Sequence, residues 1–154
     1  MLRVEDDRAA SLLRHPHERR KQRPAAGPAI VGEGSEEGGS IINISSQASL
    51  IGGGGGSLAP YGAAKAGLNH MTRSLGSAWG RKVRVNCVSL GYVRTEAMVG
   101  LLIEPEREAA VLDGIPVGRM GTPEEVGGIC LFLASEAGAY INGATIWADG
   151  GGGF

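Results

Sequence analysis

A tyrosine and a lysine four residues apart are the side chains in this sequence best suited to chemistry. Tyr61 and Lys65 lie in the segment Tyr-Gly-Ala-Ala-Lys. On a helix, side chains at this spacing share a face about one turn apart. An ammonium group beside a phenol favours the phenolate, which would let Tyr61 exchange a proton with a substrate oxygen near neutral pH. The spacing alone is suggestive only, because three tyrosines and three lysines can meet it by chance.

The segments around this pair predict a strand, a helix and a second strand. Residues 41–45 and 83–89 are short runs rich in β-branched residues, and both are typical of buried strands. Between them, residues 60–79 predict a helix, because apolar side chains recur there at three- and four-residue spacing. These side chains are Leu68, Met71, Leu75 and Trp79.

The C-terminal part predicts one more helix and one more strand. Thr122, Pro123 and Glu125 form a helix-start signature with a capping box, and the helix is expected to run to about Ala134. Residues 144–148 have strong β propensity and predict a last strand. Alternating strands and helices indicate an α/β fold, with a parallel sheet, right-handed crossovers and three layers.

A hydroxyl group stands where the first strand ends. Ser46 follows the 41–45 strand directly. A parallel α/β sheet gathers ligands at the carboxyl ends of its strands, beside the start of the next helix. Ser46 could therefore position a substrate oxygen near Tyr61.

Charge and composition exclude several classes of protein. The 15 Lys and Arg against 16 Asp and Glu give a formal net charge of −1, so we expect neither a nucleic-acid nor a membrane-surface partner. No apolar run approaches the ~20 residues of a bilayer-spanning helix. Cys87 and Cys130 are isolated in apolar runs, which predicts buried reduced thiols and favours the cytoplasm. His15 and His17 have no other ligand types nearby, so no metal site is expected.

Several motifs follow one another in a specific order. They are Asn-Ile-Ser-Ser at 43–46, Tyr-Gly-Ala-Ala-Lys at 61–65, Gly-Tyr-Val-Arg-Thr at 91–95, Pro-Val-Gly-Arg at 116–119 and Asp-Gly-Gly at 149–151. In this order the chain resembles the short-chain dehydrogenase/reductase family, of the classical type. The resemblance runs from about Gly38 to Gly151 and extends weakly upstream to Ala25.

The resemblance implies catalytic roles for three side chains. Tyr61 would be the acid or base. Lys65 would assist it and bind the nicotinamide-ribose hydroxyls. Ser46 would bond the substrate carbonyl or alcohol, with Ser45 as the less favoured occupant of that role.

The resemblance also implies a cofactor, NAD or NADP, which supplies the hydride chemistry. Gly91, Val93 and Thr95 would lie at its nicotinamide end, Val93 through its backbone, and Tyr61 and Lys65 would also contact the cofactor. Residues 96–115 would form a substrate lid. Relatives are commonly dimers or tetramers, so a homo-oligomer is expected.

The chain departs from the family pattern in four places. The interval between Ser46 and Tyr61 is about two residues longer than usual, with the surplus in the glycines 52–56. Leu90 stands where relatives commonly have proline, which should loosen the turn toward Val93. The glycine-rich pyrophosphate turn and the family's catalytic asparagine are not recognised upstream of Tyr61.

These departures predict a partial domain. We expect residues 1–23 to be a poorly ordered charged segment and residues 24–154 to be the C-terminal half of a Rossmann-like, doubly wound domain without its N-terminal βαβ units. The strand over 41–45 would then lose its usual neighbour and expose an apolar edge.

Three functions fit this sequence. The first is an NAD(P)-dependent oxidoreductase acting on a secondary alcohol or ketone. The second is a catalytically silent fragment that assembles with full-length relatives. The third is a small-ligand binding module. Titration with NADH and NADPH would distinguish the first from the second.

Overall fold

The computed structural model describes residues 29–31, 38–51, 56–102 and 104–152. The expectations for residues 1–23, for His15 and His17, and for the glycines at 52–55 fall outside these described residues.

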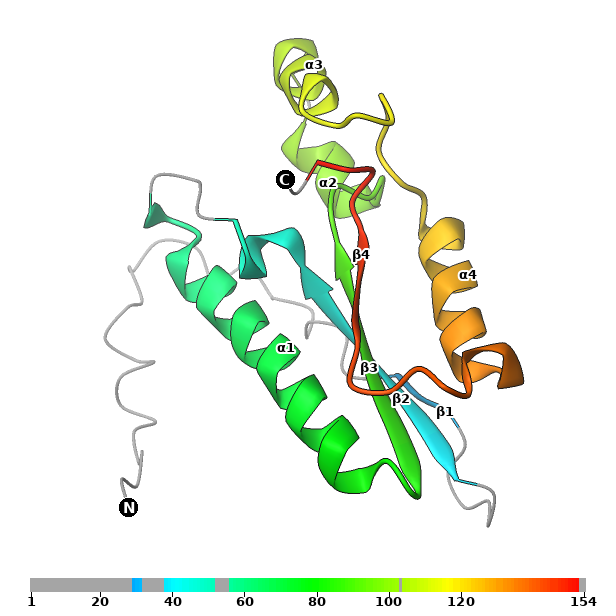
Figure 1. Cartoon of the computed structure of the whole chain (residues 1–154). Coiled ribbons are helices and arrows are strands. Elements are labelled where there is room, and N and C mark those ends of the chain that lie inside the picture. Colours follow the sequence, from blue (N-terminus) through cyan, green and yellow to red (C-terminus); the bar gives the residue numbers. More distant parts are fainter. Residues whose placement is uncertain (1–28, 32–37, 52–55, 103, 153–154) are drawn as a thin grey trace.

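The centre of the fold is a four-stranded sheet in the order β1-β2-β3-β4 (Figure 1). The strands β2 (Gly39–Ser46), β3 (Val83–Leu90) and β4 (Thr145–Ala148) are parallel to one another. Parallel strands of this kind confirm the α/β architecture predicted from the sequence.

The outer edge of β2 differs from the expectation. We predicted an uncovered edge, but β1 (Ala29–Val31) pairs with it antiparallel, placing Ala29 opposite Ile42 and Val31 opposite Ser40. The sequence analysis missed β1 because a three-residue run is too short to show a period. The new pairs satisfy backbone groups that a bare edge would leave to solvent.

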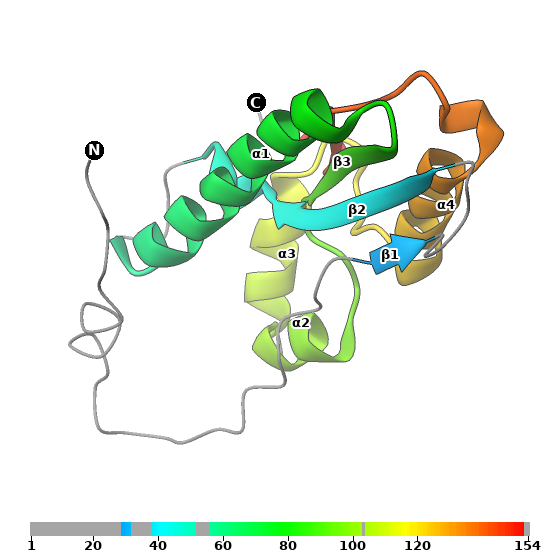
Figure 2. The same cartoon turned by 90° about the horizontal axis from the view of Figure 1, so that it is seen from below.

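Two helices lie on opposite faces of the sheet, as Figures 1 and 2 show. The helix α1 (Ala59–Trp79) covers one face, and α4 (Pro123–Ala134) covers the other. Between β3 and α4 the chain forms α2 (Glu96–Leu101) and α3 (Pro105–Asp113). Short 3-10 turns follow β2 (η1, Gln47–Ser49) and α4 (η3, Glu136–Gly138). The three layers agree with the prediction.

The face of the sheet toward α4 is apolar. Ile42 of β2, Val88 of β3 and Leu133 of α4 are almost fully buried and form the core cluster. Partly buried apolar residues from β2, β3, β4 and α4 surround them. Burial of such side chains stabilises a fold by roughly 1.5–3 kcal/mol each.

The face toward α1 is mixed, because the buried polar side chains of Asn43 and Ser45 lie there with the buried Val85 and Cys87. Of the apolar residues spaced along the helix, Leu68 and Leu75 are partly buried and the other two are exposed. Met71 is 45% exposed and Trp79 is 46% exposed. The residues that α1 buries are instead Thr72 and Gly76. A Cβ at Gly76 would lie 2.7 Å from the Gly143 backbone, so small side chains are needed for α1 to approach the sheet this closely.

None of the helices that the structure describes has an apolar stretch long enough to cross a bilayer. Within the same residues, no three histidine, cysteine or acidic side chains gather where they could hold a metal ion. Cys87 is buried and Cys130 is partly buried, and both are free thiols. Burial raises the pKa of both thiols above its usual value.

Candidate active site

Tyr61 and Lys65 lie close to the N-terminal end of α1, where Pro60 is in the first turn. The Lys65 Nζ atom is 5.7 Å from the centroid of the Tyr61 ring. Tyr61 is 47% exposed, so a substrate has access to it. The structure therefore brings the two side chains together on an accessible part of the helix.

The C-terminal part of β2 forms hydrogen bonds with both the side chain and the backbone of Lys65. Its Nζ donates a hydrogen bond to the Ile44 carbonyl oxygen at 2.9 Å. Its backbone carbonyl accepts one from the Ser45 hydroxyl at 3.2 Å. Because an ammonium group has three donors, the described residues leave two N–H bonds of Lys65 for a ligand.

The two adjacent serines have different surroundings. Ser45 is only 3% exposed and its hydroxyl is committed to α1. Ser46 is the last residue of β2, and its Oγ accepts a hydrogen bond from the Ala48 N–H at 3.2 Å. An accepting hydroxyl can still donate its proton. This difference favours Ser46 for the substrate contact.

The segment after β3 begins beside the end of β2, because Ser46 and Leu90 are partners in the strand register. Gly91 lies in tight packing here, since a Cβ at this position would meet the Asp149 Cα at 2.6 Å. Position 91 therefore requires glycine, because the backbone there lies in contact with the backbone of Asp149.

Val93 and Thr95 present hydrogen-bond donors at this edge. The Val93 N–H bonds to none of the residues that the structure describes, although Val93 forms an isolated parallel bridge with Gly121. Thr95 caps α2, and its Oγ accepts from the Met98 N–H at 3.2 Å, which leaves the hydroxyl proton free to donate. The segment expected to be a lid contains the short helices α2 and α3.

These donors fit the nicotinamide end of a dinucleotide. A carboxamide oxygen needs N–H or O–H donors such as those of Val93 and Thr95, and ribose hydroxyls suit the free N–H bonds of Lys65. Two buried polar atoms at the same edge, Ser89 Oγ and Asp149 Oδ2, have no partner among the described residues. The edge therefore has unpaired polar groups in its interior as well as the donors of Lys65, Val93 and Thr95.

An open cavity of about 390 Å³ lies between η1 and the start of α1. Its walls contain apolar and small side chains and no charged one. The larger apolar members are Leu50, Ile51 and Leu58.

The sequence analysis missed the polar residues that fix α1 to the sheet. Asn43 Nδ2 donates to Thr72 Oγ1 at 2.9 Å, and both side chains are buried. Asn69 Nδ2 donates to Ser49 Oγ at 2.8 Å, and the Cys87 thiol donates to Asn69 Oδ1 at 3.3 Å. A helical period could have shown them, because residues 65, 69, 72 and 76 lie on one face.

Comparison with known proteins identifies the family. A family model described as enoyl-(acyl carrier protein) reductase matches residues 25–152. The chain belongs to the short-chain dehydrogenase/reductase family. This membership confirms the resemblance that the ordered motifs indicated.

Two relatives show how far the similarity extends. A tropinone reductase homolog of Arabidopsis thaliana is 43% identical over 114 residues, which are 73% of this chain and 42% of the relative. The 2-dehydro-3-deoxy-D-gluconate 5-dehydrogenase of Escherichia coli is 39% identical over 128 residues, which are 82% of this chain and 49% of the relative. The chain thus spans less than half the length of these members of the family.

A solved structure is similar in fold as well as in sequence. The gluconate 5-dehydrogenase of Burkholderia cenocepacia, in complex with NADP and tartrate, matches with a TM-score of 0.69 and 33% identity. The match covers 75% of this chain and 45% of that chain. Rossmann-fold short-chain dehydrogenases are therefore the structural neighbours of this chain.

Proposed function

We propose that this chain carries the proton-transfer half of an NAD(P)-dependent oxidoreductase that interconverts a secondary alcohol and a ketone. One observation supports this most directly. The accessible Tyr61 ring lies 5.7 Å from a lysine ammonium group that is itself fixed by the Ile44 carbonyl. A phenol beside a held cation is suited to general acid–base chemistry.

The proposed reaction assigns one task to each side chain. In the direction of reduction, Tyr61 gives its proton to the substrate oxygen, and in oxidation it takes the proton back. Ser46 donates a hydrogen bond to the same oxygen. Lys65 holds its Nζ 5.7 Å from the centroid of the ring and binds the cofactor.

NAD or NADP is the proposed cofactor, and it supplies or accepts the hydride when bound. Two N–H bonds of Lys65 would hold its ribose hydroxyls. The Val93 N–H and the Thr95 hydroxyl would hold its carboxamide. NADP in the Burkholderia cenocepacia structure supports a dinucleotide cofactor.

The cavity beside α1 suggests a substrate with an apolar skeleton. Leu50, Ile51 and Leu58 offer apolar contacts to such a skeleton, beside Gly62 and Ala63, which follow Tyr61 on the helix. We propose a small neutral alcohol or ketone as the substrate. A cytoplasmic homo-oligomer is the expected setting.

A structural role is the second candidate. Several large apolar side chains of the outer helices are exposed, including Met71, Trp79, Leu131 and Phe132. Such surfaces favour association with another chain. A chain of this kind could assemble with longer relatives without catalysing a reaction.

The test compares Tyr61→Phe with Tyr140→Phe. Both changes remove one phenolic hydroxyl, but Tyr140 is fully exposed and lies at no site described above. Purified chain is titrated with NADH and NADPH by nicotinamide fluorescence, and reduction of a panel of neutral ketones is followed. We expect Tyr61→Phe to lower turnover by about 10²–10⁴-fold with nucleotide binding retained, and Tyr140→Phe to be unchanged.

Wild-type chain that binds neither nucleotide would end the enzymatic proposal and favour the structural role. Turnover that survives in Tyr61→Phe at the original rate would remove Tyr61 from the mechanism.

A further inference from the structure

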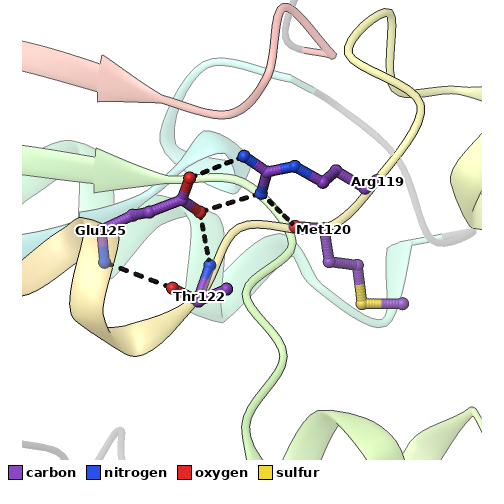
Figure 3. Close-up of polar contacts among 4 residues, drawn as sticks. All are labelled: Arg119, Met120, Thr122 and Glu125. Atoms are coloured by element: carbon purple, nitrogen blue, oxygen red, sulfur yellow. Dashed lines mark hydrogen bonds and ion pairs between the residues drawn. The ribbon is translucent and has the colours of Figure 1, made fainter.

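A network of five hydrogen bonds surrounds the start of α4 (Figure 3). One of them is the capping-box bond from the Glu125 N–H to the Thr122 Oγ at 3.3 Å. The Arg119 guanidinium donates to both oxygens of the Glu125 carboxylate, at 2.6 and 2.9 Å. The same carboxylate accepts from the Thr122 N–H at 2.8 Å, and Arg119 also donates to the Met120 carbonyl at 3.0 Å. Glu125 therefore completes the predicted capping box and also fixes the chain that enters the helix.

Gly121 lies between the residues of this network and contacts residues 92–94, which belong to the segment proposed to bind the cofactor. Gly121 donates from its N–H to the Tyr92 carbonyl at 3.0 Å, and its carbonyl accepts from the Arg94 N–H at 2.9 Å. These two bonds lie on either side of Val93, and they form the isolated bridge between Val93 and Gly121. Whatever fixes residues 119–122 thus also fixes the backbone around Val93.

We propose that Arg119 and Glu125 are positioning residues, which hold the Val93 N–H and the Thr95 hydroxyl in place for the nicotinamide carboxamide. The inference rests on the proposed function, because the ligand of these two donors is the proposed cofactor. The ion pair lies at the start of α4, about 25 residues along the chain from the two donors that it would position.

The segment needs an outside restraint because few bonds of its own hold it. Within residues 91–95 the backbone forms one hydrogen bond, from the Thr95 N–H to the Val93 carbonyl, while Gly91 bonds back to the Ala148 carbonyl and the Arg94 side chain pairs with Glu108 of α3. Residue 90 is leucine and not proline, so it does not fix the backbone before the turn. The bridge to Gly121 is the backbone restraint that acts on both sides of Val93.

The exposure of the Arg119–Glu125 pair suits a role in positioning nearby backbone rather than in the overall stability of the fold. Both side chains are about half exposed, at 56% for Arg119 and 48% for Glu125, and exposed ion pairs contribute little to overall stability. The Arg119 guanidinium and the Thr122 N–H lower the pKa of Glu125 to about 2, so its carboxylate stays charged near neutral pH. The network is therefore intact near neutral pH, where the proposed reaction would take place.

The experiment uses Glu125→Gln in the full chain. Glutamine keeps an oxygen that can accept from the Thr122 N–H, but it removes the charge that Arg119 pairs with. The matched control is Glu124→Gln, a neighbour in the same first turn of α4. Arg119→Met removes the pair from the other side, and Arg119→Lys keeps the charge but loses the bidentate geometry.

Two measurements separate positioning from general folding. Amide hydrogen exchange, followed by NMR, reports on the Arg94 and Gly121 N–H groups without any cofactor. We expect exchange of these two amides to rise about tenfold in Glu125→Gln and Arg119→Met, with Arg119→Lys intermediate and Glu124→Gln unchanged. Steady-state kinetics should show the KM for the nucleotide about tenfold higher, with kcat within about twofold.

Three results would count against the inference. Equal exchange in Glu125→Gln and Glu124→Gln shows that the pair does not restrain the segment. Faster exchange with an unchanged KM for the nucleotide shows that this restraint is irrelevant to the cofactor. Wild-type chain that binds no nicotinamide nucleotide overturns the proposed function and the cofactor role of the pair with it, while the exchange rates still decide separately whether the pair holds the segment.

Discussion

Replacing Gly91 by alanine should damage the edge of the sheet on which the proposed site is built. An added Cβ would lie 2.6 Å from the Asp149 Cα, 2.8 Å from its Cβ and 3.1 Å from Gln47 Oε1. The Gln47 side chain can turn away, but the Asp149 backbone cannot. It continues directly from β4, whose Ala148 carbonyl accepts a bond from the Gly91 N–H at 3.0 Å.

The cost follows from how far the segments must separate. Ordinary Cβ contacts begin at about 3.4 Å, so the two segments must move apart by most of an ångström. Overpacking of this kind costs about 1–3 kcal/mol. For a chain of this length each kcal/mol lowers Tm by about 3 °C, so we expect a fall of about 3–9 °C.

Thermal unfolding followed by circular dichroism measures this fall, and Gly128→Ala is the matched control. Gly128 lies inside α4, and a Cβ there would have open space around it. The same substitution should stabilise the chain at this position, by about 0.5–1 kcal/mol, because glycine is unfavourable within a helix. A Gly91→Ala chain that melts at the wild-type temperature would refute the packing argument.

Three further changes test the surroundings of the site. Thr72→Val leaves the buried Asn43 amide without its acceptor and should lower the free energy of unfolding by about 1–3 kcal/mol in urea titrations, whereas Thr72→Ser should cost less. Because the pKa of Glu125 lies at about 2 in the folded chain and near 4.5 when unpaired, its contribution is complete above pH 4.5 and disappears as the pH falls toward 2. The Tm difference between wild type and Glu125→Gln should therefore shrink over that range, and a constant difference would contradict the assignment. Burial raises the pKa of the Cys87 and Cys130 thiols, so a thiol reagent at neutral pH should modify both far more slowly in the folded chain than in urea.

Local signals in the sequence predicted most of the fold. The strand expected at 83–89 is β3 (Val83–Leu90), and the one expected at 144–148 is β4 (Thr145–Ala148). The capping box of Thr122 and Glu125 forms as predicted. These elements depend on β propensity and capping chemistry, which act within a few residues and can be read from the sequence alone.

The features that were missed depend on contacts between distant segments. The strand β1 has only three residues, and it exists because β2 offers an open edge. On α1, the apolar period named Leu68, Met71, Leu75 and Trp79; Leu68 and Leu75 are partly buried, Met71 and Trp79 are exposed, and the fully buried residues are Thr72 and Gly76. Which side of a helix is buried depends on the surface that it meets, and here that surface includes the polar Asn43 and Ser45 side chains.

The candidate site was predictable where it depends on helical spacing and unpredictable where it depends on strand pairing. The four-residue interval brought Tyr61 and Lys65 together. The different surroundings of Ser45 and Ser46 follow from which side of β2 faces α1, and a strand sequence does not contain that information by itself. The ordered motifs nevertheless favoured Ser46 for the substrate contact.

Both faces of the sheet combine apolar burial with hydrogen bonds, and the hydrogen bonds on the α1 side bear on the chemistry. On the α4 side the apolar packing of Ile42, Val88 and Leu133 is non-directional, and the Ser40 hydroxyl donates to the Leu133 carbonyl at 3.3 Å. On the α1 side, the contacts of Lys65, Asn69 and Thr72 with β2 and η1 are hydrogen bonds, which depend on both distance and angle. Such bonds fix the rotation of α1 as well as its distance from the sheet. Tyr61 is four residues from Lys65, the first of these residues, so these hydrogen bonds set the direction in which its hydroxyl can meet a substrate.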